Sequence, residues 1–241
     1  LSLPAKPLLF IVSITPPIKI HTRAIAAQAA RDYRSGDVIF IFNTADADGK
    51  QFLAGMDAEI KKVNAEAKVL SVSSVAAMNE QLSLSGTNFI ITGTTDKFQI
   101  RSLLSTLDTK STTEYYMFNV YGHPLWDRID FSSYPNFSTY SPMISSESHY
   151  KSWTQSVRKF KEGYFAKYGV YPSDHSYKGY DSAKYFGGLI AKYGANYAEH
   201  LTTEEYNGLF SSYKFNNNEA WGFVNNAVSV KIYKNSSFEL Q

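Results

Sequence analysis

Apolar runs of strand length alternate with amphipathic stretches of helical spacing through the first half of the chain. The apolar runs lie at 8–14, 38–43, 68–73, 88–92 and 114–120, and the amphipathic stretches lie at 23–33, 50–65, 75–84 and 97–107. Short buried strands that alternate with helices are typical of βαβ crossovers in a parallel sheet. The pattern therefore predicts an α/β fold in which helices flank a parallel sheet on both faces.

The clearest strand-to-helix unit begins with the apolar strand Val38–Asn43. The polar turn Thr44–Gly49 follows, and Asp48 is a suitable N-cap for the helix predicted over 50–65. Asp96 has the corresponding place before the helix at 97–107. Ligands of parallel α/β proteins bind at the carboxyl ends of the strands. The pattern therefore indicates which edge of the sheet carries a site.

The second half of the chain has a different pattern, with an irregular aromatic stretch before two long helices. Trp153 and Tyr164 have the spacing of a buried helical stripe, which we expect to be core rather than a sugar-binding platform. The predicted elements are an irregular region at 130–142, helices at 150–168, 175–193 and 202–210, and a strand at 224–233 in a terminal hairpin.

Composition narrows the class of protein. The chain has 241 residues, enough for one large domain or two small lobes, and a formal net charge of +2 that does not favour nucleic acid or an anionic membrane. It has no cysteine, which excludes disulfides and thiolate chemistry. No apolar run approaches the roughly 18 residues of a membrane span. No basic region precedes the apolar run Pro7–Ile14, so we do not expect it to be a signal peptide. Because the chain begins at Leu1 rather than Met, we expect a processed or truncated product.

No catalytic or cofactor motif is found in the sequence. A G-x-S-x-G elbow, a Walker A sequence and G-x-G-x-x-G are all absent. No two of the five histidines have the spacing of a helical metal site. Thr44–Gly49 is similar to the start of a calcium loop, but the twelfth position is Gly55 instead of Glu, which favours a capped turn. We therefore expect no catalytic residues, no metal, no cofactor and no enzyme activity.

The segment Phe160–Ile190 resembles a run found in the type I periplasmic-binding-protein fold. That run has a helix ending in Tyr-Gly, a connector with Pro, and a helix that opens with Gly-Tyr-Asp. Leu9–Pro17, Val38–Gly49 and Gly222–Tyr233 are similar to further parts of the family, so the resemblance covers most of the chain. The matching residues of the first segment are Phe165, Tyr168, Gly169, Pro172, Gly179, Tyr180, Asp181 and Ala183.

The resemblance implies a two-lobed, non-catalytic, extracytoplasmic protein that lacks the N-terminal part of lobe one. Residues 1–17 would be a crossover segment, 18–169 a Rossmann-like lobe two, and 170–241 a return to lobe one with the C-terminal strands. A small polar ligand, amino-acid-like or peptide-like, would be held between the lobes. The protein would be periplasmic or envelope-attached, as a lipoprotein is, with a membrane transporter or an envelope protein as partner.

The family's lobe-two contacts come from strand ends, which fixes the expected ligand-binding residues here. Amino-acid receptors of the family usually carry an aromatic residue in the first acidic turn, whereas this chain has Ala45 and Ala47. An alternative is therefore a ligand-free scaffold in a cell-envelope or peptidoglycan-associated assembly. A Rossmann-like hydrolase is a third class, against which the missing motifs argue. The expected ligand-binding residues are Asn43, Thr44, Asp46, Ser73, Thr92, Thr94, Tyr121 and His123.

Overall fold

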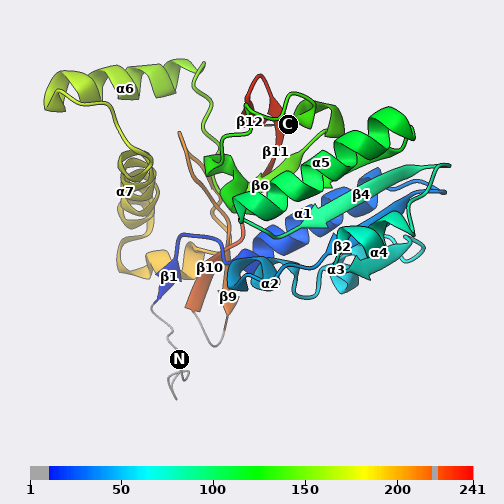
Figure 1. Cartoon of the computed structure of the whole chain (residues 1–241). Coiled ribbons are helices and arrows are strands. Elements are labelled where there is room, and N and C mark those ends of the chain that lie inside the picture. The colour runs from blue at the N-terminus through cyan, green and yellow to red at the C-terminus, as the bar shows by residue number, and fades with distance from the viewer. Residues whose placement is uncertain (1–10, 219–221, 241) are drawn as a thin grey trace. The chain divides into compact units, whose positions relative to one another are not determined.

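The computed structural model describes residues 11–218 and 222–240, which form two compact units. The small unit combines the chain up to residue 17 with 147–229, and the large unit combines 18–146 with 230–241. Figure 1 shows the elements of both along the chain. These two units do not test the lobe boundaries expected at residues 17 and 169, which stay predictions.

A seven-stranded sheet forms the centre of the large unit, in the order β12-β11-β6-β5-β4-β2-β3. The pairs that β2 forms with β3 and β4, and that β5 forms with β4 and β6, are parallel, whereas β11 and β12 are antiparallel. The predicted α/β class with a parallel sheet is confirmed. The strands are β2 (Val38–Phe42), β3 (Val69–Val72), β4 (Thr87–Thr92), β5 (Met117–Tyr121), β6 (Met143–Ser146), β11 (Ser229–Lys234) and β12 (Ser237–Leu240).

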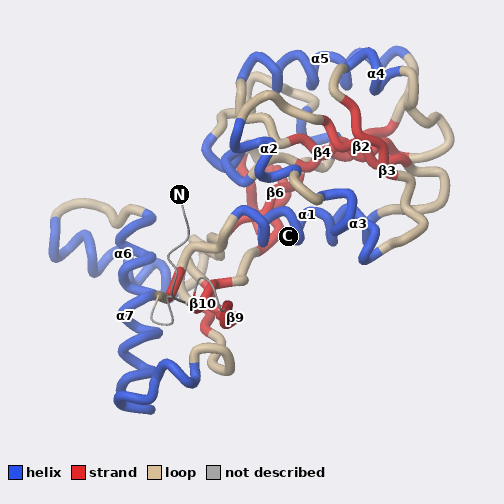
Figure 2. Tube along the Cα trace, turned by 90° about the horizontal axis from the view of Figure 1, so that it is seen from below, coloured by secondary structure: helices blue, strands red, loops and turns tan. Residues whose placement is uncertain are grey.

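Helices cover both faces of this sheet. Alternate strand residues point to opposite faces, and here both sets are apolar and need to be covered. Ile39 and Ile41 belong to the core on one face, and Val38 and Phe40 to the core on the other. Figure 2 shows α1 and α3 on one side of the strands and α4 and α5 on the other. The helices are α1 (Ile18–Asp32), α2 (Ala47–Leu53), α3 (Met56–Val63), α4 (Val75–Asn79), α5 (Lys97–Thr113), and the 3₁₀ helices η1 (Pro124–Arg128) and η2 (Phe137–Tyr140).

The single helix predicted at 50–65 is wrong, since two helices occupy this region. Gly55 lies between α2 and α3 with a φ of 73°, a left-handed conformation that interrupts the helix. Asp46 is the N-cap of α2 instead of the predicted Asp48, and its Oδ1 accepts from Gly49 N at 2.7 Å. The predicted cap at Asp96 is confirmed, because its carboxylate accepts from two backbone amides of α5.

The small unit contains two long helices and short strands. β1 pairs parallel with β10, β10 pairs antiparallel with β9, and β7 pairs antiparallel with β8. The strand predicted at 8–14 is described only from residue 11. The one predicted at 224–233 is divided between β10 and β11. The elements are β1 (Val12–Ser13), α6 (Gln155–Tyr168), α7 (Asp174–Tyr193), η3 (Gly194–His200), β7 (Tyr206–Asn207), β8 (Ser212–Tyr213), β9 (Phe215–Asn218) and β10 (Gly222–Asn225).

The helix predicted at 202–210 is wrong, and a buried carboxylate explains the difference. Asp181 of α7 is fully buried and accepts hydrogen bonds from the backbone amides of Leu209, Phe210 and Ser211. Those amides are therefore unavailable for helical hydrogen bonds, and the stretch forms β7 and the loop to β8.

The expected burial of Trp153 is also wrong. Trp153 precedes α6 and is 62% exposed, and Val157 is the buried residue of that helix. Tyr164 lies on α6, where its ring packs against Phe160 with centroids 5.9 Å apart. No helix in the described part of the chain is both long and apolar enough to span a bilayer.

Candidate ligand-binding site at the strand ends

The carboxyl ends of β2, β4 and β5 lie next to one another in the large unit. The parallel register pairs Phe42 with Thr92, and Ile91 with Tyr121. The loops that leave these strands therefore emerge at the same edge of the sheet, which we call the carboxyl edge. They carry Thr44, Thr94 and His123, so the structure brings together residues from three separate parts of the sequence.

The loop after β2 and the loop after β4 touch through two glycines. A Cβ on Gly49 would lie 2.2 Å from Thr44 Oγ1 and 2.8 Å from the carbonyl oxygen of Gly93. A Cβ on Gly93 would lie 2.6 Å from the carbonyl oxygen of Gly49. All three distances are far below van der Waals contact, so only glycine allows this approach. The close approach fixes Thr44 and Asp46 against the neighbouring loop.

His123 occupies the loop after β5 and is 4% exposed. Its Nδ1 accepts from Leu125 N at 3.1 Å, which caps η1. Its ring packs edge-on against Phe52, with ring centroids 5.3 Å apart. Burial lowers the pKa of His123, although the charges of Asp48 and Asp46 oppose this shift. The ring is therefore neutral at neutral pH, and because Nδ1 accepts, the proton is on Nε2.

Trp126 connects the loop after β5 to the loop after β4. It is fully buried, and its Nε1 donates to the carbonyl oxygen of Thr94 at 2.7 Å. Its ring packs directly on Gly122, where a Cβ would lie 2.1 Å from the indole. Trp126, Gly49 and Gly93 position the carboxyl edge, although no sequence motif marks them. Their places just after predicted strands are the one sequence feature that points to such a role.

Three polar atoms at the carboxyl edge are buried without a hydrogen-bond partner among the described residues. They are Thr44 Oγ1, Asp46 Oδ2 and His123 Nε2. Asp46 acts electrostatically on His123, and Asp46 Oδ1 and Thr44 Oγ1 both border Gly49, so the three belong to one cluster. A buried polar group without a partner costs about 1–3 kcal/mol, and native proteins contain few of them. All three residues are among those predicted to bind a ligand.

Tyr121, which was also expected to contact a ligand, has its side chain engaged within the core. It is fully buried, its hydroxyl donates to Asp32 Oδ2 at 2.9 Å, and its ring stacks on Phe89. Burial, with the nearby Asp32 charge, raises the pKa of its hydroxyl. Side chains alternate along β5, so Tyr121 points into the core beside α1. Its ring is part of the fold.

The other predicted residues lie at or near the carboxyl edge in different roles. Thr92 and Thr94 are buried, and their hydroxyls accept from the backbone amides of Thr94 and Asp96. They shape the loop into α5. Asn43 and Ser73 are exposed at the ends of β2 and β3.

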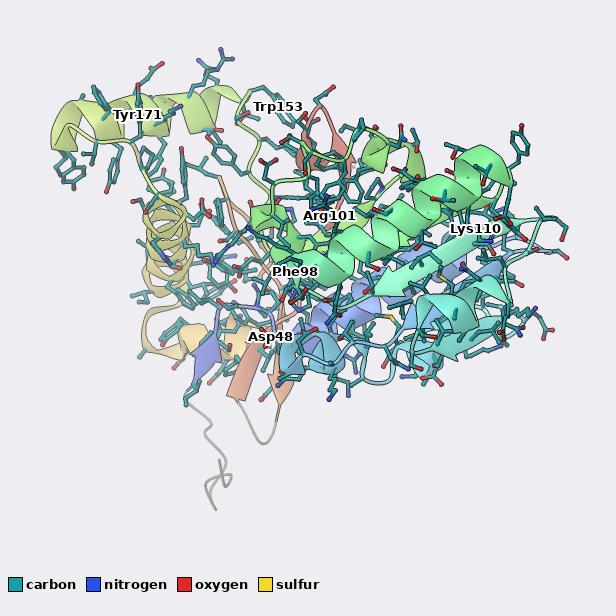
Figure 3. All side chains as sticks on the ribbon, viewed as in Figure 1. Asp48, Phe98, Arg101, Lys110, Trp153 and Tyr171 are labelled. Atoms are coloured by element: carbon teal, nitrogen blue, oxygen red, sulfur yellow. The ribbon has the colours of Figure 1, made fainter. Side chains whose placement is uncertain are left out.

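Apolar side chains are exposed beside the polar cluster. Phe98, in the first turn of α5, is 83% exposed, and Leu125, in η1, is 39% exposed. Figure 3 shows Phe98 and Asp48 toward the same end of the large unit. Exposed apolar side chains near buried polar groups are suited to contact with the apolar part of a small organic ligand.

Among the described residues, no group of three or more His, Asp or Glu side chains could hold a metal ion. A hollow of about 390 Å³ lies in the small unit, and none of the predicted ligand-binding residues lines it. His149, Lys151, Thr154, Asn207, Leu209 and Ser212 are among its lining residues.

No family model matches the chain, and no curated protein matches it significantly in sequence. Solved structures do match. An ABC transporter substrate-binding protein from Desulfitobacterium hafniense is 14% identical with a TM-score of 0.56, over 97% of this chain and 68% of that one. The leucine-binding protein LivK from Thermotoga maritima is 17% identical with a TM-score of 0.52, over 96% and 67%.

A third match is the C-domain of LpoA from Haemophilus influenzae, a regulator of PBP1A. It is 8% identical with a TM-score of 0.53, over 95% of this chain and 73% of that one. At such identities the likeness shows the fold alone, and the chain spans about two thirds of the length of these structures. The fold is that of the type I periplasmic binding proteins, as the sequence resemblance predicted.

Proposed function

We propose that this chain is part of a non-catalytic extracytoplasmic binding protein, and that the carboxyl edge of its large unit binds a small polar ligand. The observation that carries this proposal is the cluster of unpartnered buried atoms of Thr44, Asp46 and His123. A ligand that supplies the missing hydrogen bonds removes their desolvation penalty, and this favours the bound state. The fold of substrate-binding proteins is consistent with this role.

The cluster is held in place by the fold before any ligand arrives. Gly49 and Gly93 fix the first two loops against each other, and the indole of Trp126 fixes the third. Preorganised polar groups lose little conformational entropy on binding, which raises affinity. Asn43 and Ser73, exposed at the same edge, are the proposed outer contacts. An envelope location and a transporter partner complete the proposal.

The test is native mass spectrometry of the protein purified gently from its source, followed by thermal denaturation with amino acids and short peptides. We expect a small molecule to accompany the folded protein, and its addition to raise the melting temperature. Thr44→Val should abolish this rise. The control is Thr109→Val, an equivalent change on the exposed face of α5. An empty protein that no compound stabilises would contradict the proposal.

A second candidate function is a scaffold in an envelope assembly, as the regulator with a similar fold suggests. The observation that favours it is a set of exposed aromatic side chains near the two ends of α6 in the small unit. Trp153, Tyr168 and Tyr171 are 62%, 56% and 65% exposed, and Figure 3 labels the first and last of them. Exposed aromatic side chains are enriched at protein interfaces. An empty protein in the mass-spectrometry experiment would favour this candidate.

A further inference from the structure

We infer that the ligand presents to the cluster of Thr44, Asp46 and His123 an uncharged group that accepts one hydrogen bond and donates another, as a carboxamide or a peptide amide does. This rests on the proposed function and adds the chemical class of the ligand. The proposal follows from which of the three atoms donate and which accept.

His123 supplies a donor. Its Nδ1 is occupied as the acceptor for Leu125 N, which leaves Nε2–H as the unpartnered atom. The ring cannot easily turn to exchange its nitrogens, because it is 4% exposed and packs against Phe52. The ligand must therefore bring an acceptor. An ammonium group has none and would leave Nε2–H unsatisfied.

Asp46 supplies an acceptor. Its Oδ1 already accepts from Gly49 N, and its Oδ2 is the unpartnered atom. The ligand must therefore bring a donor, which an ionised carboxylate lacks. The two charged groups that act on His123, Asp46 and Asp48, are both carboxylates, so a ligand carboxylate here would also meet like charges. Thr44 Oγ1 can donate or accept and does not discriminate.

An amide satisfies both requirements at once, since its carbonyl oxygen accepts from His123 and its N–H donates to Asp46. The exposed side chains of Phe98 in α5 and Leu125 in η1 belong to the helices that follow two loops of the carboxyl edge. They provide apolar surface for a substituent on the amide. A small amide with a branched apolar group is therefore the appropriate probe.

The experiment compares isobutyramide, N-methylisobutyramide, isobutyrate and isobutylammonium, which share a carbon skeleton and differ in the polar group. Binding to the full chain is followed by the ¹H–¹⁵N NMR signals of the His123 ring, assigned with His123→Phe. The control is His175→Phe, a change at an exposed histidine. We expect an amide to bind at least tenfold more tightly than isobutyrate or isobutylammonium, and Thr44→Val to weaken it without unfolding the protein.

The two amides distinguish a primary carboxamide from a peptide bond, and tighter binding of either supports the inference. Binding of isobutyrate or isobutylammonium as tight as that of the amides, with the His123 signals shifted, would overturn the amide class and leave the binding function intact. If no probe shifts these signals at high millimolar concentration, the amide inference is wrong. An empty protein in the mass-spectrometry experiment would then indicate that the binding function fails as well.

Discussion

Thr44 gives the sharpest prediction for a single residue. Its hydroxyl is buried and unpartnered, so replacing it with an isosteric methyl removes a desolvation penalty. We predict that Thr44→Val leaves the unliganded protein as stable as the parent, or more stable by about 1 kcal/mol. The same variant should lose the stabilisation by ligand. Urea denaturation with and without ligand measures both effects, and a strongly destabilised free protein would show that the hydroxyl has a structural role.

His123 should make stability depend on pH in a predictable direction. Burial lowers its pKa in the folded protein below the ordinary value of 6.5. Below about pH 6.5 the unfolded chain therefore takes up a proton that the folded chain does not. The contribution of His123 to the free energy of unfolding is fully present above that pH. It is lost as the pH falls through the pKa of His123 in the folded protein.

Urea denaturation between pH 7.5 and 5 measures this dependence in the parent and in His123→Phe. We expect the parent to lose more stability on acidification than the variant does. His175→Phe, at an exposed position, should keep the parent's dependence. If the free energy of unfolding depends on pH equally in the parent and in His123→Phe, the prediction is wrong.

Asp181 is the buried carboxylate of the small unit, and we predict that Asp181→Asn destabilises the protein by about 2–3 kcal/mol. Its oxygens accept from three backbone amides at 2.8–2.9 Å and from Tyr206 Oη at 3.3 Å. Asparagine places an NH₂ donor against one of these donors. Asp174→Asn, in the exposed first turn of α7, is the control for urea denaturation. Similar losses for the two variants would argue against this role.

At the scale of elements, the contact between the loops after β2 and β4 should tolerate no side chain. Gly93→Ala would place a Cβ 2.6–2.9 Å from backbone atoms of Gly49, so the loops must separate. We expect a loss of about 1–3 kcal/mol, as for other overpacked sites, together with weaker ligand binding.

Gly163→Ala is the matched control, because nothing lies within 4 Å of a Cβ at this position of α6. There alanine should stabilise the helix by about 0.5–1 kcal/mol. Thermal denaturation of the two variants should therefore shift in opposite directions. An unchanged melting temperature for Gly93→Ala would show that the loops can move apart freely.

How far the sequence predicts these elements depends on whether their cause is local. The strands at β2 and β4 and the cap at Asp96 follow from apolar runs and from one side chain before a helix, and they were predicted. The break at Gly55 was missed because the apolar face continues across it from Phe52 to Ile60. The stretch at 202–210 was misassigned because the carboxylate of Asp181, some thirty residues earlier in the sequence, accepts hydrogen bonds from backbone amides at its end.

The candidate site shows the same limit. The strand-end rule predicted Thr44, Asp46 and His123 as ligand-binding residues, since it depends only on parallel strands. The rule does not say to which face the last side chain of a strand points, and Tyr121 points into the core beside α1. The roles of Trp126, Gly49 and Gly93 depend on contacts between separate loops, which no single segment of the sequence encodes.

At the scale of the whole molecule, the end of the chain completes the sheet of the large unit. Strands β11 and β12 follow the small unit in sequence, yet they pair beside β6, with Tyr233 N donating to Pro142 O at 2.8 Å. Tyr233 packs on Phe137 with ring centroids 4.9 Å apart, and Phe238 packs on Phe131 at 6.1 Å. The large unit is therefore built from two distant parts of the chain.

Removing residues 230–241 should destabilise the large unit specifically. Phe131 and Phe137 are each 1% exposed, and uncovering rings of this size costs roughly 1.5–3 kcal/mol apiece. Hydrogen exchange followed by mass spectrometry should show faster exchange in β5 and α5, while α7 in the small unit keeps its protection. A chain that ends at residue 234 retains β11, and its large unit should lose less stability. If β5 stays fully protected without 230–241, the hairpin only covers the sheet's edge, and the large unit folds from residues 18–146 alone.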